Sequence, residues 1–175
     1  MKYVTNSAPL TSVRRSPGRT ILLGALAIGT IDILWAMGMA MIEGKDPLRV
    51  LQTIAGGLLG AATFDGGAGT IVLGLALHYF IASCVMTTYY LASRKLPQLA
   101  RLPWVYGILY GIAVYVVMYQ VVLPLSAWHA KGIKLGIPLA KGLFIHMFGV
   151  GLVAALVTRW GSPNPPATER SEEVL

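Results

Sequence analysis

Four long apolar runs, separated by short polar segments, dominate the pattern of hydrophobic and polar positions along this chain of 175 residues. Each run reaches the roughly 20 residues that an α-helix needs to cross the hydrocarbon core of a bilayer. Because lipid offers no hydrogen-bonding partners, such runs satisfy their backbone groups by forming helices. We therefore predict an up-down bundle of four transmembrane helices. Their expected bounds are Thr20–Ile42, Ala68–Ala92, Trp104–Leu125 and Pro138–Trp160.

A shorter amphipathic segment lies between the first two runs. Its apolar positions recur at the spacing of one helix face: Leu48, Leu51, Ile54 and Leu58. Gln52 and Thr53 fall elsewhere, so we predict that residues 47–60 form a short helix lying in the membrane interface. Residues 64–67 then predict a turn into the second long helix. The fold class that follows is an all-α membrane protein.

Composition supports this interpretation. Hydrophobic residues make up 55% of the chain and charged residues only 12%, and the mean hydropathy is +0.67. A soluble domain carries about 25% charged residues. The net charge of +7 does not indicate nucleic acid as a partner, because the basic residues gather at the ends of the apolar runs and form no continuous stripe. The lone Cys84 lies in an apolar run, where we interpret it as a small hydrophobic residue.

The distribution of Lys and Arg predicts the orientation of the bundle. One side of the predicted membrane carries nine of them: Lys2, Arg14, Arg15, Arg19, Arg94, Lys95, Arg101, Arg159 and Arg170. The other side carries five: Lys45, Arg49, Lys131, Lys134 and Lys141. We therefore expect both termini in the cytoplasm. Residues 1–19 form the predicted N-terminal tail, residues 20–160 the transmembrane domain, and residues 161–175 a Pro-rich, disordered C-terminal tail.

Three ionisable side chains, Asp32, His78 and His146, interrupt the apolar runs. Counting from the outer ends of their helices places all three at depths that agree within roughly 3–5 Å, at 1.5 Å per residue. A charged side chain at the centre of a bilayer costs on the order of 3 kcal/mol or more. Three such groups at one level therefore indicate the working centre of the protein.

Small residues share the helix face of each of these three side chains. They are Ala25, Gly29 and Ala36 beside Asp32, Gly74 and Ala82 beside His78, and Gly142 and Gly149 beside His146. Because small residues mark helix–helix contacts in membranes, we predict that the three polar groups point into the bundle. The third helix adds a GxxxG pair, Gly107 and Gly111, and three possible supporting residues, Tyr115, Tyr119 and Gln120.

The chemistry of this polar cluster leaves four interpretations open. It is a hydrogen-bonded cluster that fixes helix register, a proton relay or ion pathway, a ligand set for haem or a metal, or three side chains that do not meet. His titrates near neutral pH, as proton pathways require. Two histidines on different helices, each with Gly four residues earlier, could hold a haem edge. All three side chains could also bind Zn or Fe.

Motifs of conventional enzymes are absent from the sequence, including GxSxG, the P-loop and a close carboxylate pair, so we expect no enzyme. Three hypotheses for function follow. The first is transport or proton handling through Asp32, His78 and His146. The second is a non-catalytic accessory subunit, or a homodimer, that packs its Gly-rich faces against other membrane subunits. The third is a b-type haem or metal-binding membrane protein.

Several segments are similar to a family of bacterial four-helix inner-membrane proteins. They read GGLLGAATFDGG, LGLALHYFIAS, YYLASRKLP, LYGIAVYVVM, VVLPLSA and GLFIHMFGVGL. Over roughly residues 20–160 the chain resembles the YagU-like proteins, through His78 in the second helix, Pro124 at the exit of the third and His146 in the fourth. The resemblance implies a place in the bacterial inner membrane and an association with acid tolerance.

Overall fold

The computed structural model describes residues 16–129, 132–133 and 135–161, and within these ranges the chain forms helices and no strands. Four helices are long and apolar enough to cross a membrane, with 26, 29, 23 and 25 residues. They confirm the four spans predicted from the hydrophobic pattern. Their bounds are Pro17–Ile42, Gly67–Lys95, Pro103–Leu125 and Ile137–Gly161. The predicted tails lie almost wholly outside the described residues.

The first span is the helix α1, Pro17–Ile42, and it begins three residues before the predicted start. The hydroxyl of Ser16 accepts a hydrogen bond from the backbone N–H of Arg19, and Pro17 takes the first helical position. Ser before a helix and Pro at its first turn are a favourable start, because the hydroxyl satisfies an N–H that has no partner in the helix. The polar start of α1 thus extends the helix beyond its apolar run.

The segment between the first two spans contains the helix α2, Leu48–Leu59, and a 3₁₀ turn η1, Gly60–Asp65. The short helix is therefore present, and its place at the membrane interface stays a prediction. Leu48 and Leu58 stay exposed, whereas Gln52 is buried and its amide donates to the Thr70 hydroxyl at 3.3 Å. The Thr63 hydroxyl donates to the Gln52 carbonyl at 2.8 Å. The bond from Gln52 to Thr70 therefore joins α2 to the second span, together with the buried Leu51.

The second span is α3, Gly67–Lys95, and it packs against α1 and α2. Gly74 of α3 faces the backbone of Leu51 so closely that a Cβ there would meet the Leu51 carbonyl. At the other end, the short helix α4, Gln98–Arg101, is fixed by the Tyr89 hydroxyl, which donates to the Leu99 carbonyl at 2.9 Å. Small residues and polar anchors therefore hold both flanking helices close to the second span.

The third and fourth spans each change from α-helix to π-helix part of the way along. The third consists of α5, Pro103–Val117, the π segment η2, Met118–Val122, and α6, Leu123–Leu125. The fourth consists of α7, Ile137–Phe144, the π segment η3, Ile145–Gly151, and α8, Leu152–Gly161. In the third span, Pro124 has no N–H to donate to the preceding turn, which favours a wider turn just before it. Such π segments occur frequently at functional sites.

The GxxxG pair of the third span packs inside the chain. A Cβ on Gly107 would meet Leu152 and Ala155, and a Cβ on Gly111 would meet the backbone of His146. Gly151 faces both glycines from the opposite helix. Gly107 and Gly111 therefore pack against η3 and α8 of the same chain. This is the glycine face that the sequence predicted for packing against an accessory subunit or a second copy.

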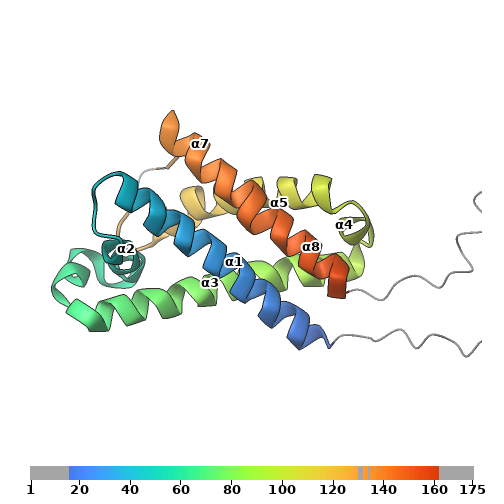
Figure 1. Ribbon diagram of the computed structural model, residues 1–175, viewed down its shortest axis with the longest axis horizontal. Coiled ribbons are helices and arrows are strands. Elements are labelled where there is room, and N and C mark those ends of the chain that lie inside the picture. The colour runs from blue at the N-terminus through green and yellow to red at the C-terminus, as the bar shows by residue number, and fades with distance from the viewer. Residues whose placement is uncertain (1–15, 130–131, 134, 162–175) are drawn as a thin grey trace, which may run out of the picture.

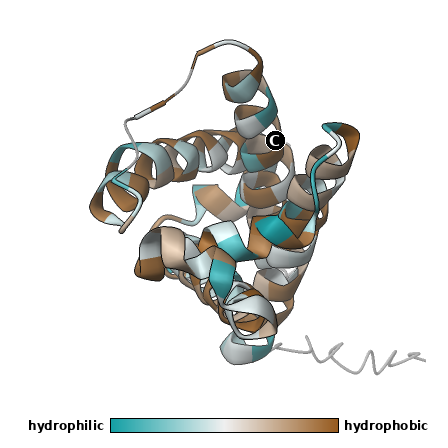
Figure 2. Cartoon of the chain, turned by 90° about the vertical axis from the view of Figure 1, so that its left-hand side faces the viewer, coloured by the Kyte–Doolittle hydropathy of each residue, from teal (hydrophilic) through white to brown (hydrophobic). Residues whose placement is uncertain are grey.

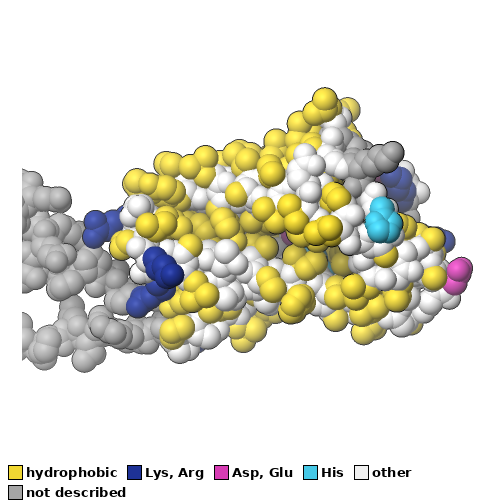
Figure 3. All heavy atoms as spheres, turned by 180° about the vertical axis from the view of Figure 1, so that it is seen from behind, with side chains coloured by type: hydrophobic (Ala, Val, Ile, Leu, Met, Phe, Trp, Pro, Cys, Tyr) yellow, Lys and Arg dark blue, Asp and Glu magenta, His cyan; other side chains and the backbone are white. Residues whose placement is uncertain are grey.

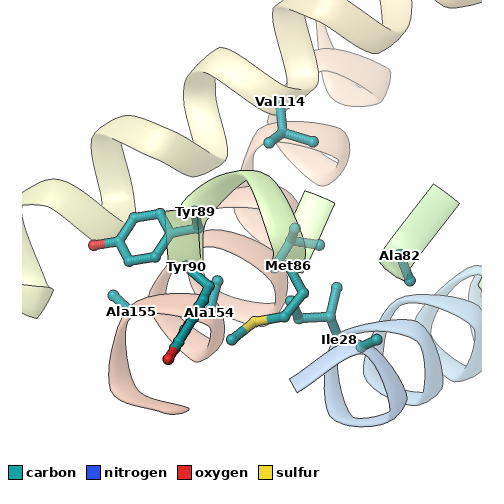
Figure 4. Packing of buried hydrophobic residues seen from close by; sticks show 10 residues of the cluster. Ile28, Ala82, Met86, Tyr89, Tyr90, Val114, Ala154 and Ala155 are labelled. Atoms are coloured by element: carbon teal, nitrogen blue, oxygen red, sulfur yellow. The ribbon is translucent and has the colours of Figure 1, made fainter. Parts of the chain in front are cut away.

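The buried core lies toward the end of the molecule where α1 begins and α8 ends. Met86, Tyr89, Ala154 and Ala155 are at most 1% exposed, and they meet residues of α1 and α5 in one cluster (Figure 4). At the same end, a Cβ on Gly161 would meet the Thr20 side chain, so the start of α1 and the end of α8 lie side by side (Figure 1). An even number of spans brings the two ends to one side.

The outer surface of the described helices is broadly apolar. Large exposed side chains come from all four spans, for example Leu34, Phe80, Leu109 and Phe144. Figure 3 shows this apolar face with basic side chains gathered near its two ends. In Figure 2, seen from the end that carries α2, hydrophobic positions run along every long helix. This distribution is that of a multi-pass protein whose four helices face lipid.

Candidate functional site

A cavity of about 490 Å³ lies between the buried core and α2. Its walls come from all four spans, from α2 and from the segment after α6. Most of the wall is aliphatic, and ionisable side chains reach it from α1, α3 and the fourth span. A cavity of this size and composition falls within the range of small-molecule sites, which are about 300–1,000 Å³ and mostly apolar.

Asp32, His78 and His146 all line this cavity. The structure thus places the three predicted residues around one space, each half-buried. No described hydrogen bond or ion pair joins any two of them. The sequence interpretation of a directly hydrogen-bonded cluster is therefore not the arrangement observed in the described residues.

The Asp32 carboxylate has no hydrogen-bond or ion-pair partner among the described residues. Its helix face carries Gly29 and Ala36, which line the same cavity, as the predicted stripe of small residues required. A carboxylate within a membrane-spanning segment is costly unless it faces a cavity or a partner. Asp32 is the acidic side chain that the described wall of the cavity offers to a ligand.

His78 connects the second span to the first. Its Nε2–H donates to the Gly29 carbonyl of α1 at 2.8 Å, and its ring lies edge-on to the Tyr79 ring at 5.6 Å between centroids. A carbonyl oxygen only accepts, so this bond fixes the proton on Nε2 and leaves Nδ1 able to accept one. Tyr79 in turn bonds Thr30 across the same helix pair at 2.9 Å.

His146 lies in the π segment η3 of the fourth span. Its Nδ1–H donates to the Gly142 carbonyl one turn earlier at 2.9 Å, which leaves Nε2 able to accept a proton. The ring of Tyr115 stands edge-on to this imidazole, with 5.3 Å between ring centroids. The ring of Tyr119 packs on that of Tyr115, with 4.4 Å between their centroids. A row of aromatic rings therefore links the two π segments.

The three possible supporting residues have different positions. Tyr119 lines the cavity, while Tyr115 is 1% exposed and packs behind it. Gln120, in contrast, is exposed and is not part of the cavity wall. Tyr119 follows Tyr115 by four residues and shares its helix face, as do Met118 and Val122 after Val114, whereas Gln120 falls on the other side.

Three further residues of the cavity wall were not identified from the sequence. Trp35 lies three residues after Asp32 on the same helix face, and this spacing is a signal that could have identified it. The indole N–H of Trp128 donates to the Thr53 carbonyl of α2 at 2.8 Å, and its ring closes one side of the cavity. No local signal indicates this long-range bond.

The third unpredicted residue, Lys141, links the cavity to the end of α1. Its ammonium forms an ion pair with Glu43 at 3.1 Å, and Lys45 pairs with the same carboxylate at 2.7 Å. The hydrogen bonds from Lys45 and then from Lys141 hold the pKa of Glu43 below its usual value. Among the residues described, the lysine of the cavity wall therefore already has an anionic partner outside the Asp32 site.

The haem and metal interpretations do not fit the side chains around this cavity. Within the described ranges, no three His, Cys, Asp or Glu side chains are close enough to hold a metal ion together. The glycine faces that would admit a haem edge are filled by protein, because Gly74 meets the backbone of α2 and Gly142 meets the Tyr115 ring. The donor set is better suited to protons and to organic ligands.

Comparisons with known proteins leave the chain to be interpreted from its own geometry. No family model, no curated protein and no solved structure matches it. The resemblance to YagU-like proteins therefore stays a prediction from the sequence. Over the described residues, the structure establishes a helical protein with four helices long and apolar enough to span a membrane. A cavity among these helices is lined by Asp32, His78 and His146.

Proposed function

We propose that this chain is a small transport or proton-handling protein of the membrane, working through the cavity that Asp32, His78 and His146 line. One observation carries the proposal: an Asp32 carboxylate without a described partner faces a cavity whose walls come from all four spans. Ionisable groups inside membrane segments are costly, and they mark substrate or proton pathways when they face an internal cavity. Asp32 is the group that binds and releases the proton.

The two histidines serve as neighbouring proton acceptors in this proposal. Each ring donates from one nitrogen to a backbone carbonyl, on Gly29 or Gly142, and keeps the other nitrogen able to accept a proton. These bonds fix the ring orientation, so that each imidazole changes its charge without losing its position.

The finer arrangement in the membrane belongs to the same proposal. The four spans form an up-down bundle in the bacterial inner membrane, with both termini in the cytoplasm and α2 at the outer interface. The excess of basic residues on the side of the termini supports this orientation. The polar segments around α2 are suited to a headgroup environment. There the guanidinium carbon of Arg49 lies 5.1 Å from the centroid of the Phe64 ring. The cavity then opens toward the outer half of the membrane.

Proton flux through the purified protein tests the proposal. Liposomes that enclose a pH-sensitive dye are driven by a potassium diffusion potential, and the wild type is expected to acidify them faster than empty liposomes. Asp32→Asn removes the carboxylate while keeping a similar shape, so we expect the proton flux of this variant to fall at least about tenfold. A tenfold change in rate corresponds to about 1.4 kcal/mol.

The matched control is Asp65→Asn, which changes an exposed acidic residue outside the cavity wall and should keep the wild-type flux. Circular dichroism and gel filtration of both variants report whether they fold. If correctly folded Asp32→Asn conducts protons as fast as the wild type, the proposal is wrong.

A further inference from the structure

A second hollow lies between the second and third spans. It measures about 340 Å³ and is lined by residues of α3, α5 and η2. Tyr110 bridges the two spans beside it, where its hydroxyl donates to the Val85 carbonyl at 2.7 Å. Cys84, Val117 and Val122 of its wall are exposed on the outside of the bundle. This groove therefore opens on the surface that the four spans present to lipid.

The groove and the central cavity adjoin each other. Five residues line both: Ile81, Val85, Val114, Met118 and Val122. All five are apolar, and two of them, Met118 and Val122, belong to the π segment η2. The unbranched thioether side chain of Met118 adapts its shape readily. Only side chains of this kind separate the lipid-facing groove from the cavity that contains Asp32.

The cavity itself is suited to one class of ligand. Its wall is largely aliphatic, it carries the aromatic rings of Trp35, Tyr119 and Trp128, and it contains the Asp32 carboxylate. Aromatic faces attract cations within about 6 Å, and the attraction strengthens where water is excluded. The competing cation, Lys141, is already paired with Glu43.

We propose that the ligand of this cavity is a lipophilic organic cation, which reaches Asp32 from the bilayer through the groove between α3 and α5. The inference rests on the proposed function and names its substrate class. The cation exchanges its lipid surroundings for the aliphatic wall and places its charge beside the carboxylate. Because lipid-soluble cations concentrate in the bilayer, a lateral route delivers them without passing α2.

Binding of tetraphenylphosphonium to the purified full-length protein tests the ligand class. We expect saturable binding to the wild type and to Asp65→Asn, and an affinity at least about tenfold lower for Asp32→Asn, a loss of 1.4 kcal/mol or more. Tetraphenylborate has the same shape and the opposite charge, so it should not compete. Equal binding of the two ions, unaffected by Asp32→Asn, would show selection by apolarity alone and would overturn the inference.

Cys84, the one cysteine of the chain, provides a test of the route because it lines the groove and not the cavity. A pyrene maleimide adduct fills the groove, whereas a methylthio adduct at the same sulfur adds little volume. The pyrene adduct should slow association of tetraphenylphosphonium with the reconstituted protein at least about tenfold, while the methylthio adduct leaves it unchanged. Unchanged association with the pyrene adduct would exclude this route.

The two proposals fail separately. If proton flux depends on Asp32 but tetraphenylphosphonium does not bind, the substrate class is wrong and the proton-handling function stands. If tetraphenylphosphonium binds through Asp32 without any proton flux, the cavity is a cation site and the transport proposal is wrong.

Discussion

Gly111 shows how a single missing side chain sets the distance between two spans. A Cβ at this position would meet the carbonyl of His146, and backbone cannot rotate away as a side chain can. The same helix face holds Gly107 against Leu152. The position of His146 at the cavity wall therefore depends on a glycine in a different span.

Replacement of Gly111 by Ala should destabilise the protein. We expect a loss of about 1–3 kcal/mol in the free energy of unfolding, the usual cost of adding a methyl group to a tightly packed site. Titration of the purified protein with sodium dodecyl sulfate in mixed micelles, followed by circular dichroism, measures this loss. Gly38→Ala is the matched control, because a Cβ there meets nothing within 4 Å.

In this comparison Gly38→Ala should be neutral or slightly stabilising, since Ala is the better helix former by up to about 1 kcal/mol. Equal stability of Gly111→Ala and Gly38→Ala would contradict the close contact between α5 and η3.

The candidate site was partly predictable residue by residue. Asp32, His78 and His146 stand out because each is ionisable within an apolar run, and small neighbours placed them on inward faces. Their common cavity agrees with that prediction. Lys141 was counted only as a basic loop residue, because nothing in its local sequence indicates a contact with Glu43, 98 positions away.

At the scale of elements, the orientation of α2 and the two π segments were beyond the hydrophobic pattern. Periodicity groups Leu48 and Leu58 on one apolar face of α2, but it does not indicate that Gln52 is buried and bonded to Thr70 of α3. Hydrogen-bond partners on another helix are not encoded in the spacing of apolar residues. The two π segments, η2 and η3, have no signature in the spacing of apolar residues either.

The Glu43 ion pairs connect the end of α1 to α7, and they predict a dependence of stability on pH. Lys45 and Lys141 lower the pKa of Glu43 in the folded protein relative to its usual 4.5. The stabilising contribution is therefore fully present above the unfolded pKa and is lost as the pH falls through the lower, folded pKa. We expect the thermal midpoint in detergent to fall as the pH is lowered below the usual pKa of Glu43, 4.5.

Glu43→Gln should reduce this fall in the thermal midpoint, because the variant has no carboxyl group to protonate. The exposed Asp65, which has no described ion pair, provides the comparison through Asp65→Asn. If Glu43→Gln and the wild type lose the same stability over this pH range, the ion pairs do not contribute.

At the scale of the whole molecule, the two ends of the described bundle differ in packing. The end at which α1 starts and α8 finishes is filled by the buried core, whereas the end nearer α2 contains the cavity. A bundle that is closed at one end and hollow at the other gives a ligand access from one side and from the lateral groove.

Accessibility of introduced cysteines should establish the orientation. In a Cys84→Ser background, Lys45→Cys lies beside α2 and Gln98→Cys lies in α4, at opposite ends of the second span. A membrane-impermeant maleimide applied to spheroplasts should label Lys45→Cys and leave Gln98→Cys unlabelled until the membrane is permeabilised. The reverse pattern would place the termini outside, against the distribution of basic residues.

The sequence by itself determined the class of this protein. Four apolar runs of spanning length can form only helices in lipid, and three ionisable residues within them are costly enough to indicate the centre of the bundle. These conclusions depend on local composition and length, which are properties of the chain alone.

Only the tertiary structure decided what surrounds the three ionisable residues. The cavity exists because glycine contacts draw α5 against the fourth span, while Trp128 and α2 fold over the opposite end. The groove between α3 and α5, and the ion pair that occupies Lys141, also join residues far apart in the sequence. Packing between distant segments follows from the summed geometry of many contacts, so no single stretch of sequence specifies it.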